Sequence, residues 1–284
     1  MKIGGTKDIK FFVKSYIHRN KTRLTGKRVI DIPAGSGYST EILHQSGAIV
    51  EAYDLFPEFF KYEGVKCRKA NLEVDLPIES SYADVVLFQE GIEHLSDQLH
   101  ALREINRILR PRGKLLLTTP NYSSLKAKIS YLLNESESYM LMPPNQLESI
   151  WFTTGENTDD RFYFGHVFLI GLQRLKLLAM LSGLRLLNIH HTRVNVTSLF
   201  LLLFYYPLVL LSSYRAYRRA VKKNESVPVP IKKKVLWESF KLQINPKVLI
   251  DAHLFVEFEK YCELDDIARK ANLYRKHDTT DFQT

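Results

Sequence analysis

The chain has 284 residues, 45% hydrophobic and 25% charged, which are the proportions of a folded soluble protein with a sizeable core. Its net charge of +9 is unevenly placed. Cys67 and Cys262 are far apart and match no metal or redox spacing, which favours a reducing compartment with both thiols inert. The polar first ten residues lack the apolar stretch of a signal peptide, which favours a cytoplasmic protein.

The first half of the chain alternates predicted strands and helices. Residues 27–32 predict a buried strand, 33–37 a glycine-rich turn and 38–46 a helix. Further strands are expected at 49–53, 64–68, 83–88 and 114–118. A helix carrying Leu99, Leu102, Ile105 and Leu109 at helical spacing lies before the last of these and is expected to stop at Pro111. Such alternation implies a parallel sheet with right-handed crossovers.

The second half is less regular. Residues 122–134 predict a helix, and the polar segment 135–160 predicts a long loop or lid. A strong helical pattern covers 168–182 and is capped by Gly183. Two more strands are expected at 184–194 and 254–258.

The glycine-rich turn indicates a nucleotide cofactor. Glycines let the backbone approach a ligand, and the helix that follows offers unpaired N–H groups. Asp54, at the end of the second strand, can accept hydrogen bonds from ribose hydroxyls. A dinucleotide loop needs a third glycine where this chain has Thr40, and an acid heads the turn at Asp31. Both features favour S-adenosylmethionine.

At this point the sequence resembles the class I methyltransferases. Asp31 to Gly37 resembles their first motif, with Pro33 replacing the first glycine, and Asp54 matches the ribose acid. Segments 70–72, 84–95, 109–121 and 166–184 resemble the later motifs in the correct order. Asn71 stands where an aspartate near the adenine is usual. The likeness spans roughly residues 25–195.

The resemblance implies an α/β fold: a Rossmann-like, doubly wound, seven-stranded sheet with a late insertion between strands six and seven. We divide the chain into an N-terminal helical segment (1–24), a cofactor-binding core (25–194), a hydrophobic and basic insertion (195–247) and a last strand with a tail (248–284). The cofactor is expected to contact Asp31, Pro33, Ala34, Gly35, Gly37, Asp54, Leu55, Asn71, Leu72, Gln89 and Glu90.

Glu90, Glu93 and His94 form an E-x-x-E-H pattern at the carboxyl end of the fourth strand, the edge where open α/β sheets bind ligands. The pattern resembles ubiquinone-pathway O-methyltransferases and small-RNA terminal 2′-O-methyltransferases. We expect His94, Glu93 and His166 to be the catalytic residues and assign no metal. The alternative, a divalent ion held by Glu90, Glu93, His94 and His166, stays open, as does catalysis mostly by proximity.

The insertion begins with an apolar run at 199–211, about 13 residues and so short of the ~20 that span a bilayer; Pro207 should kink it. A basic block with the single acid Glu225 follows. It contains Arg215, Arg218, Arg219, Lys222, Lys223, Lys232, Lys233 and Lys234. We expect 199–234 to dock on the inner face of the membrane. A core helix with a charged linker is equally open, and nucleic-acid binding leaves the apolar run without a role.

The predicted reaction is methyl transfer from S-adenosylmethionine, to a hydroxyl oxygen of a small-molecule, glycan or lipid-linked acceptor. A long carboxyl-terminal extension resembles that of bacterial enzymes that modify surface glycans or lipid-linked intermediates. Two alternatives remain: a metal-assisted RNA 2′-O-methyltransferase and a non-catalytic cofactor-binding protein. The sequence leaves the acceptor and the oligomeric state undetermined.

Overall fold

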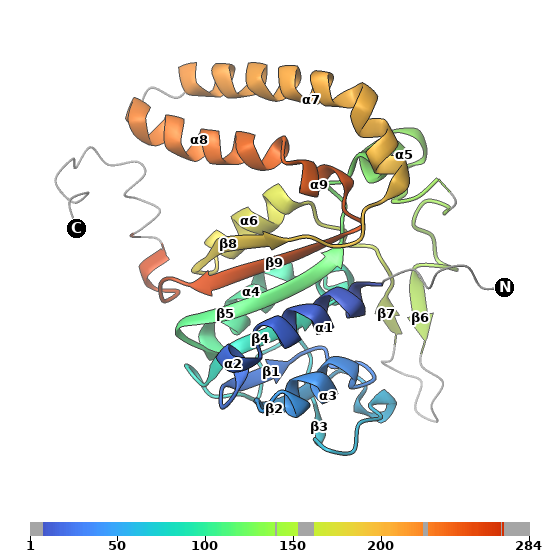
Figure 1. The fold of residues 1–284 in the computed structure, drawn as a ribbon, viewed down its shortest axis with the longest axis vertical. Helices are drawn as coiled ribbons and strands as arrows, with labels where there is room; N and C mark the ends of the chain where they lie inside the picture. Colours follow the sequence, from blue (N-terminus) through green and yellow to red (C-terminus); the bar gives the residue numbers. More distant parts are fainter. Residues whose placement is uncertain (1–7, 140, 153–161, 224–226, 268, 270–284) are drawn as a thin grey trace.

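A computed structural model describes residues 8–139, 141–152, 162–223, 227–267 and 269. Its centre is a seven-stranded sheet in the order β3-β2-β1-β4-β5-β9-β8 (Figure 1). The first five strands are parallel, and β9 is antiparallel to both β5 and β8. The strands are β1 (Arg28–Asp31), β2 (Ile49–Asp54), β3 (Cys67–Lys69), β4 (Ala83–Gln89), β5 (Leu109–Pro120), β8 (Leu184–His190) and β9 (His253–Lys260). The predicted fold class is confirmed.

Helices cover both faces of the sheet because neighbouring residues in each strand face opposite ways. Val29 packs with α1 (Ile9–Arg19) and α3 (Tyr38–Gln45) on one face. Ile30 packs with α4 (Gln98–Ile108) and α6 (Leu172–Met180) on the other. Both strand faces are therefore apolar, as expected for a parallel sheet buried between helices. The short helix α2 (Lys21–Leu24) connects α1 to β1.

The helix before β5 ends earlier than predicted. Leu109 was expected on the helix, but its backbone is extended and it pairs with Ala83 of β4 as the first residue of β5. Pro111 supplies the reason, because a proline ring disfavours helical backbone in the residues just before it. Two other strands also shift: β3 starts at Cys67 rather than at residue 64, and β8 ends at His190 rather than at 194.

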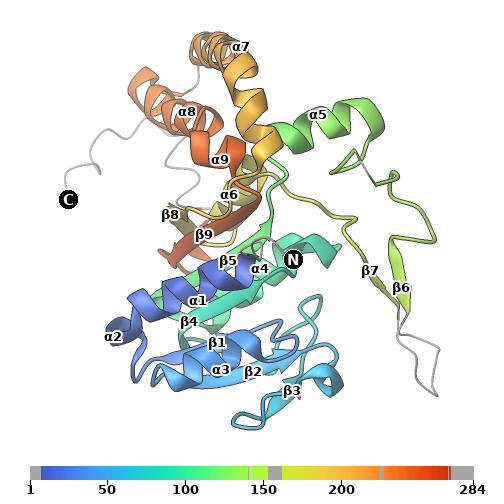
Figure 2. The ribbon, with the colours of Figure 1, turned by 45° about the vertical axis from the view of Figure 1, so that its right-hand side comes forward.

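The segment predicted as a loop or lid contains regular structure. After α5 (Leu125–Asn134), the short strands β6 (Ile150–Phe152) and β7 (Phe162–Phe164) pair antiparallel as a separate sheet. Figure 2 shows this pair extending beyond the carboxyl edge of the main sheet. Residues 153–161 of the predicted lid lie outside the described part.

The insertion is helical. It forms α7 (Val196–Lys222), α8 (Val229–Gln243) and α9 (Pro246–Ile250) between β8 and β9. The apolar run at 199–211 is part of a longer element: α7 is one helix of 27 residues that continues through Pro207 and bends along its length (Figure 1). Within the described residues, α7 is the one helix long and apolar enough to cross a membrane, and only 11% of its apolar window is buried.

Candidate active site

The glycine-rich turn lies at the carboxyl edge of the sheet, between β1 and α3. Gly35 and Gly37 both have left-handed backbone, with φ of +53° and +84°, and Gly37 is the N-cap of α3. A Cβ on Gly37 would lie 2.8 Å from the Phe60 ring, whereas the space beside Gly35 is open. Gly37 is therefore crowded by Phe60 and Tyr62, whereas Gly35 leaves room for a ligand above the turn.

Asp54 joins the end of β2 to this turn. Its two carboxylate oxygens accept backbone N–H groups, from Gly35 at 2.7 Å and from Phe56 at 2.8 Å. Each oxygen keeps a lone pair, so the carboxylate can still accept hydrogen bonds from the two hydroxyls of a ribose. The turn thus fits the ribose end of S-adenosylmethionine, with Asp54 as the acceptor.

Asp31, predicted to contact the cofactor, lies beneath the turn. Its side chain is 1% exposed and accepts the Thr40 hydroxyl at 2.6 Å. Burial raises the pKa of Asp31 to about 7, against the Thr40 hydrogen bond, which lowers it. Its observed contact holds the start of α3 against β1. Pro33 and Ala34 continue the turn, and the Ala34 N–H donates to the Tyr53 carbonyl of β2.

The residues expected beside the adenine gather near the ends of β2 and β3. Leu55 is half-buried and Leu72 is buried. The Asn71 side chain accepts the Glu73 backbone N–H at 2.9 Å, so its carbonyl is occupied while its amide nitrogen keeps its donors. The Phe56 ring also lies here, with its centroid 5.2 Å from that of the Tyr163 ring of β7. Tyr163 was not assigned to the site from the sequence.

Gln89 and Glu90 end β4 beside the turn. Gln89 accepts the Ser39 hydroxyl of α3 at 2.7 Å. Glu90 has left-handed backbone, φ of +49°, and its N–H donates to the Thr118 carbonyl of β5. A non-glycine residue held in this conformation is uncommon. Here it ends β4, and its side chain turns toward β9.

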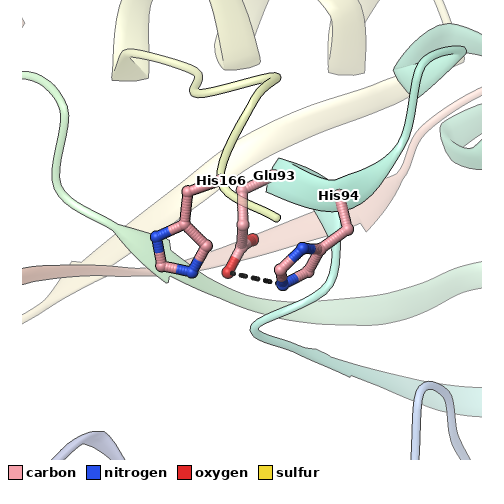
Figure 3. Close-up of side chains that lie close together, drawn as sticks. All are labelled: Glu93, His94 and His166. Atoms are coloured by element: carbon pink, nitrogen blue, oxygen red, sulfur yellow. Dashed lines mark ion pairs between the residues drawn. The ribbon is translucent and has the colours of Figure 1, made fainter. Parts of the chain in front are cut away.

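Glu93, His94 and His166 come together, as predicted, although His166 is far away in sequence (Figure 3). One ligand atom from each lies within 4.8 Å of the other two. Figure 3 shows the Glu93 carboxylate between the two imidazole rings, with Glu93 and His94 on the short turn after β4. Glu93 Oε2 accepts the Thr119 hydroxyl at 2.9 Å, while Oε1 is buried without a hydrogen bond.

Backbone carbonyls fix the orientation of His94. Its Nδ1 lies 2.7 Å from the Phe164 carbonyl oxygen and 3.2 Å from that of Gly165. A carbonyl only accepts, so Nδ1 carries a proton, and in the neutral ring Nε2 has a free lone pair. Nε2 lies 4.0 Å from Glu93 Oε1. His94 can thus accept a proton from a substrate or bind a metal ion.

The charges of the cluster are mixed. Burial raises the pKa of Glu93, and burial together with the Glu93 charge raises the pKa of Glu90, because two nearby carboxylates resist ionising together. A 3.0 Å contact with Glu137 raises the pKa of His166 and favours its charged form. A cationic His166 offsets part of the carboxylate charge.

Sequence reasoning missed two members of this edge. His253, the first residue of β9, has Nε2 3.4 Å from Glu90 Oε2, and burial lowers its pKa. Glu137 follows α5 and binds His166. The pairing of Pro120 with His253 brings His253 to the end of β5, and predicting it required the antiparallel register. The Glu90 carboxylate therefore contacts His253 and is not part of the Glu93–His94–His166 cluster.

Two hollows lie elsewhere. One, of about 320 Å³, is lined by Arg23, Lys27 and Arg110, and the other by Ile49 and Lys66. Both lie at the amino ends of the strands. Because ligands in open α/β sheets bind outside the carboxyl ends, we place the reactive edge at the glycine-rich turn and the Glu93–His94–His166 cluster.

Comparison with known proteins gives the family. A family model described as a methyltransferase domain matches residues 8–189. Ubiquinone biosynthesis O-methyltransferases are similar: that of Xanthomonas oryzae pv. oryzae is 34% identical over 107 residues, 34% of this chain and 45% of the relative. That of Xanthomonas campestris pv. campestris is 32% identical over 110 residues, 36% of this chain and 46% of the relative. The match thus spans less than half the length of these relatives.

Solved structures also align over most of the chain. A SAM dependent methyltransferase from Archaeoglobus fulgidus covers 88% of this chain and 94% of its own, with 15% identity and a TM-score of 0.49. The 1,6-didemethyltoxoflavin-N1-methyltransferase of Burkholderia thailandensis, with bound S-adenosylhomocysteine, covers 89% and 78%, with 13% identity and a TM-score of 0.44.

Proposed function

This chain belongs to the methyltransferase domain family, with S-adenosylmethionine as its cofactor, and on that premise we propose that it methylates a hydroxyl oxygen. The acceptor we propose is a small molecule, a glycan or a lipid-linked intermediate. The cofactor supplies an activated methyl group, so the protein's task is to hold the acceptor oxygen in line and remove its proton.

The observation that carries this proposal is the free Nε2 of His94. Its ring is fixed by the Phe164 carbonyl and lies beside the buried Glu93 carboxylate. A hydroxyl is a poor nucleophile until its proton is accepted. His94 Nε2 would take that proton, and Glu93 would stabilise the resulting imidazolium. Cationic His166 would hold the acceptor or its developing negative charge.

The first test is calorimetric titration of the full chain with S-adenosylmethionine, S-adenosylhomocysteine and NAD. Binding of the first two, without NAD, supports the cofactor assignment. Acceptors are then tested by release of S-adenosylhomocysteine, with phenols, sugars and lipid-linked sugars as separate classes. Cofactor binding without transfer to any class would favour the non-catalytic alternative.

A metal-assisted reaction is a second candidate, favoured by the donor set. Glu93 Oε1, His94 Nε2 and His166 fit Mg²⁺, Mn²⁺ or a related ion, and Glu93 Oε1 is buried without a hydrogen bond. The ion would orient and acidify the acceptor hydroxyl. Transfer that falls after chelation and returns with Mn²⁺ supports this version. Transfer unchanged by chelation rejects it in favour of His94 as the base.

An RNA 2′-hydroxyl is the alternative acceptor, and the basic block supports it. Arg215, Arg218 and Arg219 are exposed on α7, and Lys233 and Lys234 on α8. Phosphate contacts would make binding fall steeply with salt. Salt-dependent retention of RNA together with methyl transfer to it would favour this acceptor. If the protein does not retain RNA even at low salt, RNA is excluded as the acceptor.

We also propose that the protein is cytoplasmic. Residues 199–234 of its insertion would make peripheral contact with the inner face of the membrane. Exposed Phe200, Phe204 and Leu208 together with the basic block support this contact. Flotation with vesicles of phosphatidylcholine and phosphatidylglycerol tests it, with a chain lacking 199–234 as the comparison. Equal flotation of both chains would contradict it.

A further inference from the structure

The helix α7 presents its apolar side outward. Its two buried residues are Ser198 and Ser213. By contrast, Leu203 is 71% exposed, Phe204 62% and Leu208 60%. A helix packed on a soluble protein normally buries its apolar face and exposes its polar one. Here the order is reversed, so a core helix with a solvated linker does not account for α7.

One face of α7 carries both the apolar and the basic residues. Phe200, Phe204, Leu211, Arg218 and Lys222 are spaced four, seven, seven and four residues apart, and such spacings return to the same side of a helix. The first part of this face is therefore apolar and the last part cationic. Apolar groups favour the acyl region of a leaflet and lysine or arginine the anionic headgroups.

The opposite side of α7 is held by the rest of the protein. The Ser198 hydroxyl accepts the Lys126 N–H of α5 at 3.1 Å. Farther along, Tyr217 packs against Trp237 and Phe240 of α8, with ring centroids 5.4 and 5.9 Å apart. Figures 1 and 2 show α8 beside α7 and α5 beside its start. Contacts near both ends of this side suit a helix lying flat on one leaflet.

The apolar surface does not end with α7. The end of α5 exposes Tyr131 by 50%, Leu132 by 80% and Leu133 by 70%. The segment after it exposes Leu141, Met142 and Leu147, the last by 91%. These residues lie outside the insertion, and of them Tyr131 also packs edge-on against Tyr122, with ring centroids 5.6 Å apart. The helices α5 and α7 pack against each other, so the exposed end of α5 belongs to an element that adjoins α7.

The same segment reaches the reactive cluster. Tyr139, between the end of α5 and Leu141, is 40% exposed. Two residues earlier, Glu137 contacts His166 at 3.0 Å. Residues 131–139 thus connect the exposed end of α5 to the cluster.

We propose that α7, the end of α5 and residues 141–147 form one surface that enters a single anionic leaflet and opens the Glu93–His94–His166 cluster toward it. This surface rests on the proposed function and deepens it: the acceptor is an amphiphile, with its hydroxyl at the cluster and its apolar part in the lipid. The binding partner is identified by charge: the basic block has eight basic residues and one acid, which favours a membrane with anionic headgroups.

The test measures how close tryptophans lie to lipid in the full chain. The protein has two, Trp151 and Trp237, and the Trp151 ring lies 5.7 Å from that of His94. In W237F, Trp151 reports on the cluster. In W151F/W237F, a single tryptophan replaces Phe204, Leu132 or, as the control, Ile49. Ile49 is 55% exposed at the amino end of β2, away from α5 and α7.

Vesicles of phosphatidylcholine and phosphatidylglycerol carry a nitroxide near the acyl carbonyl. We expect tryptophan fluorescence to fall about twofold for F204W, for L132W and for Trp151 in W237F, and to stay unchanged for I49W. Side chains in the interface lie ~5–10 Å deep, within reach of a nitroxide at the acyl carbonyl. Pure phosphatidylcholine should quench little. S-adenosylhomocysteine binding, measured by calorimetry, checks that each variant is folded and tests the cofactor assignment separately.

Other outcomes are informative. Quenching of F204W alone would overturn the joint surface and leave the peripheral contact of 199–234 standing. Quenching of none would remove the membrane contact altogether, while cofactor binding could still support the methyltransferase. An emission shift of L132W that depends on protein concentration without vesicles would assign the surface to a second copy of the chain and overturn the proposal.

Discussion

His94 Nδ1 lies 2.7 Å from the Phe164 carbonyl oxygen, a contact between the turn after β4 and the strand β7. The carbonyl fixes the proton on Nδ1 and leaves Nε2 for chemistry. It also couples the ring to the outer two-stranded sheet, because Phe164 pairs with Ile150. The position of the proposed base therefore depends on a segment outside the main sheet.

Replacing His94 should separate catalysis from cofactor binding. In His94→Ala we expect the rate of methyl transfer to fall at least about 10²-fold, since proton acceptance by a positioned side chain contributes on that order. Binding of S-adenosylhomocysteine should stay within about twofold, because His94 lies beyond the glycine-rich turn. His18→Ala, an exposed histidine on α1, is the matched control. Equal loss of binding and rate in His94→Ala would contradict the assignment.

Replacing Asp54 should act on the cofactor. In Asp54→Ala the carboxylate is lost and the Gly35 and Phe56 N–H groups lose their acceptors. We expect calorimetry to show affinity for S-adenosylmethionine at least about tenfold lower, the loss of a charge-assisted hydrogen bond. Asp54→Asn keeps one oxygen and should lose less. Exposed Glu63→Ala should bind normally, and normal binding by Asp54→Ala would remove Asp54 from the site.

The two glycines of the turn should respond differently to alanine. Both need left-handed backbone, which costs an alanine about 1 kcal/mol. At Gly37 the new Cβ would also approach Phe60 to 2.8 Å, while at Gly35 it meets open space. We expect Gly37→Ala to lower the unfolding free energy by roughly 2–3 kcal/mol and Gly35→Ala by about 1 kcal/mol. Urea unfolding measures both, and equal losses would contradict the packing argument.

Glu257 of β9 should make stability depend on acid pH. The hydrogen bond from His190, together with the hydrogen bond and charge of Lys114, lowers its pKa from 4.5 to about 2, against desolvation, which raises it. The carboxylate stabilises the fold above pH 4.5, and this stability is lost as the pH falls toward about 2. The full effect is on the order of 2–3 kcal/mol. Glu257→Gln should unfold more easily at pH 7 and show a shallower decline between those pH values, measured by urea unfolding.

The cofactor-binding part of the site was largely predictable, because the sequence patterns that mark it are local. The turn from Asp31 to Gly37 and the acid at Asp54 follow directly from strand ends, and the contact of Asp54 with Gly35 brings them together. Errors there concern boundaries: Leu109 lies on β5 because Pro111 ends the helix early. The observed role of Asn71, accepting the Glu73 N–H, could not be predicted from its motif alone.

By itself, the sequence determined the order of the strands of the main sheet, the glycine-rich turn, and the presence of an acid and histidine cluster with an apolar, basic insertion. Periodicity and strand ends encode these features locally. Only the tertiary structure decided that Glu90 is directed to His253, that Glu137 contacts His166, and that α7 exposes its apolar face beside α5. These relationships depend on antiparallel register and helix packing between segments far apart in the chain, which no local pattern encodes.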